Sequence, residues 1–164
     1  ALQFASDNTD ITAGLGLIDT TAWYGAAAPK DWAERAEKAH SQGLASLVDF
    51  QKTRWFSDKF RQEHIEIVDE CIRIFLENDI EGYVATCQAM GAFDGRTAMA
   101  AVRVPTEIIV GEEDYAAPVA MARALHEGIQ DSSLTIIPAS RHLTPLENPE
   151  IIFSKIKKLI EAAG

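Results

Sequence analysis

The segment VPTEIIVGEEDYAAP (residues 104–118) gives the clearest indication of the fold. Its first half, residues 104–111, predicts a strand, and Pro105 lies at the strand entry, where a missing N–H is tolerated. Its second half is a polar loop that carries Asp114 and ends at Pro118, where a helix over residues 118–128 is expected to begin. A strand, a loop and a helix in this order indicate one crossover of a layered α/β protein.

Two further stretches extend this pattern in both directions. Residues 13–19 (AGLGLID) form an apolar run without polar alternation, which is typical of a buried strand in a parallel sheet. Residues 133–138 (SLTIIP) predict another strand, and a terminal helix is expected over residues 149–163, with Asn148 as its N-cap. The order of these elements predicts an α/β fold with parallel strands, flanking helices and right-handed crossovers.

A helical insert separates the first strand from the second. Strong helix formers follow Pro29, and further helices are expected over residues 44–52, 57–76 and 80–90. Apolar residues recur at steps of three and four, the spacing of a helix buried on one face, at Ile65, Val68, Ile72 and Phe75. The predicted organisation is a core strand with its flanking helix (1–21), a helical region (22–95) and a C-terminal α/β core (96–164).

Composition excludes several classes of protein. The chain has 164 residues, of which 47% are hydrophobic, and its net charge is −10, from 15 Lys and Arg against 25 Asp and Glu. This negative charge, without any basic cluster, argues against nucleic-acid binding. Two cysteines are too few for a disulfide framework or a cysteine-rich zinc module. No apolar run is long enough to cross a bilayer and no signal peptide is recognisable, so the expected location is cytoplasmic.

Two loops carry the residues best suited to catalysis. Asp114 follows the strand at 104–111, and His142 follows the strand at 133–138, in the loop ASRHLTP (139–145). In an open parallel sheet, functional groups gather at the carboxyl ends of the strands, so these two side chains are expected at the same edge. An Asp that orients a His acting as a general base requires this geometry. The alternatives are an Asx-turn role for Asp114 and backbone contacts for His142.

These residues also carry a resemblance to a known family. The acid loop and the histidine loop are similar to those of the α/β-hydrolases. Four segments resemble the 3-oxoadipate enol-lactonases: GLIDTTAWYG (16–25), TRWFS (53–57), GEEDY (111–115) and RHLTPLE (141–147). The resemblance implies that Asp114 is the acid and His142 the base of a Ser-His-Asp triad, and that residues 22–95 form a helical cap. The implied reaction is hydrolysis of a lactone or carboxylic ester in aromatic catabolism, without a cofactor or a metal.

The chain departs from this family in one respect. The family's serine lies in a Gly-x-Ser-x-Gly elbow, and none of the eight serines has glycine on both sides at that spacing. The sequence therefore resembles the C-terminal part of a hydrolase, and this chain alone is expected to be inactive. Two alternatives remain open: a non-catalytic fragment or split subunit that only binds a partner, and a different α/β-hydrolase such as an esterase, a carbon–carbon hydrolase or a dehalogenase.

The absent elbow leads to an expectation about partners. The strand at 13–18 would normally pair with the strand that leads into the nucleophile, so its edge is expected to be open. The expected partners are a complementary N-terminal part that carries the serine, or a second copy of the chain bound through this edge, together with a small lactone or ester. No nucleic acid and no membrane is expected among them.

Three further side chains are candidates for contact with the substrate. Trp23 and Trp55 could line an apolar pocket, although packing within the helical region would explain them equally well. The guanidinium of Arg54 could bind a substrate carboxylate, with a surface ion pair as the alternative. Glu112 and Glu113 are expected to be solvated. The remaining histidines are expected at the surface and the cysteines inside helices: His40, His64, His126, Cys71 and Cys87.

Overall fold

The strand predicted over residues 104–111 lies at the centre of a three-stranded parallel sheet. The computed structural model describes residues 1–164. β2 (Thr106–Gly111) pairs with β1 (Leu15–Ile18) on one side and with β3 (Ser132–Ile137) on the other, both in parallel. All six residues of β2 are buried, as expected for a central strand covered on both faces. The predicted α/β class with a parallel sheet is confirmed.

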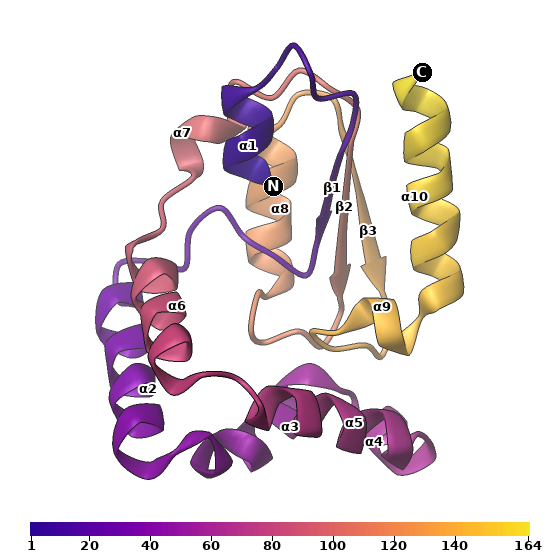
Figure 1. Cartoon of the computed structure of the whole chain (residues 1–164). Coiled ribbons are helices and arrows are strands. Elements are labelled where there is room, and N and C mark those ends of the chain that lie inside the picture. Colours follow the sequence, from indigo (N-terminus) through magenta and orange to yellow (C-terminus); the bar gives the residue numbers. More distant parts are fainter. The chain divides into compact units, whose positions relative to one another are not determined.

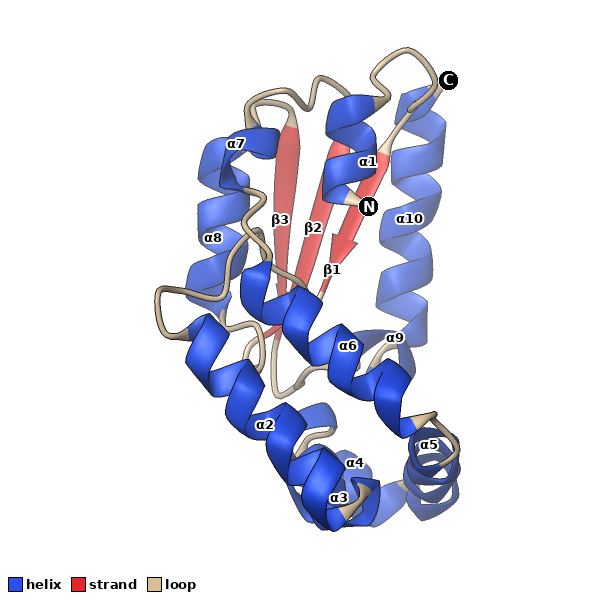
Figure 2. Ribbon diagram, turned by 60° about the vertical axis from the view of Figure 1, so that its left-hand side comes forward, coloured by secondary structure: helices blue, strands red, loops and turns tan.

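Helices cover the two faces of this sheet (Figures 1 and 2). On one face lie α1 (Leu2–Asp7), α7 (Arg96–Met99) and α8 (Val119–Gly128), and on the other lies α10 (Pro149–Ala163). The core packs the apolar side chains of the strands against α1 and α8; its most deeply buried members are Val102, Ile108, Val110, Ala122, Leu125 and Ile129. Burial of this kind stabilises the fold by about 1.5–3 kcal/mol for each large apolar side chain.

A second unit is entirely helical. It contains α2 (Ala28–Gln42), the short 3-10 helix η1 (Leu44–Leu47), α3 (Val48–Trp55), α4 (Asp58–Glu63), α5 (Ile65–Leu76) and α6 (Ile80–Ala92). Its core gathers Ala39, Leu44, Leu47 and Phe75, with partly buried Trp55, Ile80 and Tyr83 packed against them. α2 and α6 approach closely at Gly91, where an added Cβ would lie 3.2 Å from the Cα of Pro29.

Contacts within the chain divide it into these two units. The sheet unit comprises residues 1–23 and 94–164, and the helical unit comprises residues 24–93, where the sequence predicted a helical insert over 22–95. The role of the helical unit as a cap over a substrate pocket stays a prediction.

Several helix boundaries differ from those predicted. The expected helix over 44–52 is divided into η1 and α3, and the expected stretch over 57–76 is broken at His64, whose φ of −131° and ψ of 50° are not helical. Val68, Ile72 and Phe75 are buried as the spacing predicted, whereas Ile65 is 58% exposed because it is the first residue after this break. The short helix α9 (Thr144–Glu147) was not predicted; its first two residues were assigned to the loop at 139–145.

Side-chain caps hold the first turns of two helices in the second unit. The hydroxyl of Ser57 accepts a hydrogen bond from the Phe60 N–H at the start of α4. The carboxylate of Asp79 accepts one from the Gly82 N–H, at 2.7 Å, at the start of α6. Each cap satisfies one of the N–H groups that the first helical turn leaves without a backbone partner.

Candidate active site

The carboxylate of Asp114 is fixed by the loop that follows β2. Its side chain is fully buried. One oxygen, Oδ1, accepts hydrogen bonds from the N–H groups of Ala116 at 2.7 Å and Ala117 at 3.0 Å. This is the turn geometry that the sequence offered as an alternative to a triad role. Because these bonds occupy only Oδ1, the second oxygen remains available for another partner.

That partner is His142, in the loop that follows β3. Its Nδ1 lies 2.9 Å from Oδ2 of Asp114, and 21% of its side chain is exposed. An ionised carboxylate can only accept, so Nδ1 carries the hydrogen of this bond and Nε2 is the ring nitrogen that can take up a proton. The structure therefore brings together the two residues that the sequence predicted at one edge of the sheet.

A close approach of the two loops makes this contact possible. Gly111 ends β2, and a Cβ at this position would collide with the carbonyl oxygens of Ser140 and Arg141. Backbone hydrogen bonds join the loops, from Glu112 N–H to Ile137 O at 2.8 Å and from Glu113 N–H to Ser140 O at 2.9 Å. Glycine is required here because it allows the main chains to approach closely.

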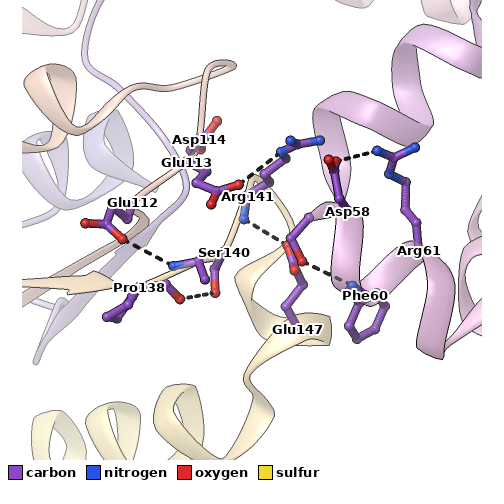
Figure 3. Close-up of polar contacts among 12 residues, drawn as sticks. Asp58, Phe60, Arg61, Glu112, Glu113, Asp114, Pro138, Ser140, Arg141 and Glu147 are labelled. Carbon is purple, nitrogen blue, oxygen red and sulfur yellow. Dashed lines mark hydrogen bonds and ion pairs between the residues drawn. The ribbon is translucent and has the colours of Figure 1, made fainter.

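Side-chain contacts also hold the loop that carries His142 in place (Figure 3). The N–H of Arg141 donates to Glu147 at 2.9 Å, and its guanidinium forms an ion pair with Glu113 at 3.6 Å. The buried hydroxyl of Ser140 donates to Pro138 O and accepts from Asn148 Nδ2 at 2.6 Å. Asn148 occupies the predicted N-cap position of α10, but its side chain makes no cap bond and supports the histidine loop instead.

A third strand end contributes a carboxylate that the sequence analysis did not single out. Asp19 directly follows β1, is 9% exposed, and accepts two hydrogen bonds from Thr144 in the segment after His142. Burial raises the pKa of Asp19 to about 7; hydrogen bonds from Thr144 and the nearby His142 oppose this rise, and Asp114 adds to it. Its place at the end of an apolar strand, in the motif GLIDTTAWYG, was the signal that could have found it.

The three predicted substrate-contact residues are divided between the units. Trp23 belongs to the sheet unit, where the guanidinium of Arg96 lies 3.8 Å from the centre of its ring. Arg54 and Trp55 belong to the helical unit. The Arg54 guanidinium lies over the rings of Trp32 and Phe50, 5.6 Å from the centre of each.

Trp55 has a structural explanation of its own. It meets the ring of Phe75 edge-on at 5.5 Å and packs against the core of the helical unit. Packing therefore accounts for the place of Trp55, and contact with a substrate stays a prediction for all three residues. As expected, Glu112, Glu113, His40 and His126 are exposed.

The remaining polar residues suggest no metal centre. The structure contains no group of three or more His, Cys, Asp and Glu side chains that could hold a metal ion. Cys87 is buried and Cys71 is partly exposed. None of the helices combines the length and the apolar character needed to span a bilayer.

Comparison with known proteins gives two kinds of relative. In sequence, the chain is 35% identical over 133 residues to 3-oxoadipate enol-lactonase 1 of Acinetobacter baylyi, a match that covers 79% of this chain and 50% of that enzyme. It is 31% identical over 119 residues to 3-oxoadipate enol-lactonase 2 of the same organism, covering 73% of this chain and 44% of that enzyme. The chain thus spans about half the length of the curated relatives it matches. No family model matches it.

Solved structures agree on the fold. The enol-lactonase from Burkholderia xenovorans matches 98% of this chain with a TM-score of 0.92 and 26% identity, and 60% of that chain is covered. An esterase from Thermogutta terrifontis matches 99% of this chain with a TM-score of 0.88 and 25% identity, again covering 60% of that chain. The chain therefore belongs to the α/β-hydrolases, and its fold corresponds to the C-terminal part of theirs.

Proposed function

We propose that Asp114 and His142 are the acid and the base of a Ser-His-Asp hydrolase whose serine is supplied by residues outside this chain. One observation carries the proposal: the hydrogen bond between Asp114 Oδ2 and His142 Nδ1, formed by two loops that leave the sheet at the carboxyl ends of neighbouring strands. This is the arrangement in which an aspartate fixes the tautomer of a catalytic histidine and stabilises its protonated form.

The proposed reaction opens a lactone ring in two steps. In the first, Nε2 of His142 takes the serine proton while the serine oxygen bonds to the lactone carbonyl carbon. The ring carbon–oxygen bond then breaks, and His142 returns the proton to the departing ring oxygen. In the second step, His142 removes a proton from water, whose oxygen attacks the carbonyl carbon of the acyl-serine. The bond between that carbon and the serine oxygen then breaks, and His142 returns the proton to the serine oxygen as the acid leaves. Asp114 remains ionised throughout, and no cofactor is required.

The proposed substrate is 3-oxoadipate enol-lactone or a close analogue. The names of the two Acinetobacter relatives and of the Burkholderia structure support this choice. That substrate carries a free carboxylate beside the reacting ring. In the proposal, Arg54 binds this carboxylate, because a guanidinium matches its geometry, and Trp23 and Trp55 contact the apolar part of the substrate.

The proposed partner is a nucleophile-bearing part of an α/β-hydrolase, bound at the open edge of β1. β1 is paired only with β2, so its other edge is free for a further strand. In the same unit, two apolar side chains of α10 are exposed, Phe153 to 71% and Ile160 to 67%. The matches cover 44–60% of the length of these relatives, which supports a partner that supplies a further part of the fold.

A reconstituted enzyme tests the proposal. The nucleophile-bearing part of the Acinetobacter relative would be supplied to this chain, either fused ahead of Ala1 or as a separate polypeptide; this preparation is called the assembled enzyme below. We expect it to hydrolyse 3-oxoadipate enol-lactone, with the activity abolished by His142→Ala and retained in Asp10→Asn, which changes an exposed aspartate of the same unit. The isolated chain should be inactive and should not react with a serine-directed phosphonate. Activity that survives His142→Ala would refute the assignment.

Simple ester hydrolysis is the second candidate function. The similarity to the Thermogutta esterase favours it, because that protein matches this chain nearly as well as the enol-lactonase does. The two candidates differ in the need for a substrate carboxylate. An assembled enzyme that prefers p-nitrophenyl acetate to the enol-lactone would support the esterase and remove the proposed role of Arg54.

A further inference from the structure

Asp19 holds a position that is unfavourable for an ordinary structural residue. It directly follows β1 and has a φ of 49°, in the left-handed region that side chains other than glycine rarely adopt. Its carboxylate is almost completely buried, and its Oδ1 has no hydrogen-bond partner in the structure. A buried polar atom without a partner is destabilising. The residue at the end of β1 therefore has an uncommon backbone conformation and a buried carboxylate oxygen, and both lower the free energy of unfolding.

The two side-chain hydrogen bonds of Asp19 both lead to the histidine loop, while its backbone N–H donates to Ile109 O in β2 at 2.9 Å. Its Oδ2 accepts a hydrogen bond from the Thr144 N–H at 2.9 Å and another from the Thr144 hydroxyl at 2.7 Å. Thr144 is fully buried, lies two residues after His142 and begins α9. The two partners are 125 residues apart in sequence, so this contact ties the first strand of the sheet to the segment that carries the base.

We propose that Asp19 is a positioning residue for His142: by fixing Thr144, it holds the imidazole against Asp114. This inference rests on the proposed function. The three strand ends then have separate tasks, because β2 supplies the carboxylate that orients the base, β3 supplies the base, and β1 supplies the anchor of the loop. His142 and Asp114 are the titratable groups near Asp19, and burial raises the pKa of Asp19 to about 7.

Two substitutions of Asp19 distinguish the effect of its hydrogen bonds to Thr144 from the effect of its negative charge. Asp19→Ala removes both hydrogen bonds to Thr144. Asp19→Asn keeps an oxygen that can accept both of them and removes the negative charge. Thr144→Val removes only the hydroxyl donor and leaves the N–H in place. Asp10→Ala changes an exposed aspartate on the same unit and serves as the matched control.

The first readout is the His142 Nδ1–H proton in the NMR spectrum of the isolated 164-residue chain, which does not depend on activity. We expect this hydrogen-bonded proton in wild type, in Asp19→Asn and in Asp10→Ala. In Asp19→Ala the signal should be lost by exchange with water, and in Thr144→Val it should be weakened. Circular dichroism establishes whether each variant is folded. A folded Asp19→Ala chain with an unchanged signal would overturn the proposal. If Asp19→Ala does not fold, an unchanged signal in folded Thr144→Val would overturn it instead.

The second readout is the kinetics of the assembled enzyme. Misplacement of a catalytic group by about 1 Å can lower the rate by about 100-fold, so we expect Asp19→Ala to lower kcat by about 10- to 100-fold with little change in KM. Asp19→Asn should restore most of this loss. An assembled enzyme inactive with wild-type Asp19 would refute the proposed function, while the NMR signal would still decide the positioning role. Equal kcat values for wild type and Asp19→Ala would refute the positioning role alone.

Discussion

The two units of this chain hold their polar side chains in different ways. In the sheet unit, Asp114 and His142 are 28 residues apart and meet because two parallel strands are locked in register, with β2 buried along its whole length. In the helical unit, Arg54 lies over aromatic rings of its own unit, Trp32 and Phe50. A fixed hydrogen bond suits proton transfer, whereas a guanidinium on a helical element suits the binding of a ligand carboxylate.

The largest expected effect breaks the contact in the sheet unit. Asp114→Asn places an amide where the carboxylate accepts the Nδ1 hydrogen of His142, so the imidazole is no longer held in the reactive tautomer. By analogy with the same change in serine proteases, we expect kcat of the assembled enzyme to fall by about 10,000-fold. Steady-state kinetics with the enol-lactone measures the effect, and Asp10→Asn, which should keep kcat within about twofold, is the control. A loss below tenfold would remove Asp114 from the proposed triad.

The next effect concerns the stability of the sheet unit. The pKa of Asp19 is about 7 in the folded chain against 3.8 ordinarily, so the unfolded chain loses this proton at a lower pH than the folded chain. The contribution of the neutral carboxyl is complete below pH 4 and is lost as the pH rises to about 7. At 1.36 kcal/mol per pKa unit, the loss is at most about 4 kcal/mol.

Asp19→Asn should remove this dependence. The free energy of unfolding of the variant should therefore exceed that of wild type at pH 8, and the difference should disappear near pH 4. Urea denaturation at four pH values between 4 and 8 measures the difference, with Asp10→Asn as the control. Parallel curves for Asp19→Asn and wild type would contradict the raised pKa.

A smaller effect tests the close approach of the two loops. Gly111→Ala adds a methyl group that would collide with the carbonyl oxygens of Ser140 and Arg141, so the loops must separate. We expect kcat to fall by about 100-fold through misplacement of His142. Overpacking should also lower the free energy of unfolding by about 1–3 kcal/mol.

The matched control is Gly25→Ala in the other unit. Gly25 has a positive φ of 98°, but an added Cβ would meet no atom within 4 Å. This change should therefore destabilise the chain through backbone strain and leave kcat unchanged. Equal kcat values for Gly111→Ala and wild type would show that the distance between the loops does not control the reaction.

The smallest effect concerns the helical unit. Arg54→Ala should raise KM for the enol-lactone about tenfold, which corresponds to about 1.4 kcal/mol of lost binding, and should leave kcat nearly unchanged. The KM for p-nitrophenyl acetate, which has no carboxylate, should not change. Arg73→Ala is the control, because that side chain is half-exposed and forms ion pairs with Glu70 and Glu77. Equal shifts of KM for both substrates would exclude Arg54 as the carboxylate ligand.

The sequence predicted the order of the elements in the sheet unit well, because apolar runs and helical spacing are local signals. It also predicted the meeting of Asp114 and His142, since two parallel strands bring the loops that follow them to one edge. The break at His64 was missed because no glycine or proline interrupts residues 58–76. Asn148 was assigned as a cap, but its side chain finds a better partner in Ser140 than in the first turn of α10.

Local sequence patterns were enough to predict the class of the fold and the two loops that carry an acid and a base, because a strand buried on both faces must be apolar. The contact of Asp19 with Thr144, the close approach of the loops at Gly111 and the exposure of Phe153 became visible only in the folded chain. These features depend on distances between segments far apart in the chain. Hydrophobic spacing records which face of an element is buried, and carries no information about which distant segment covers that face.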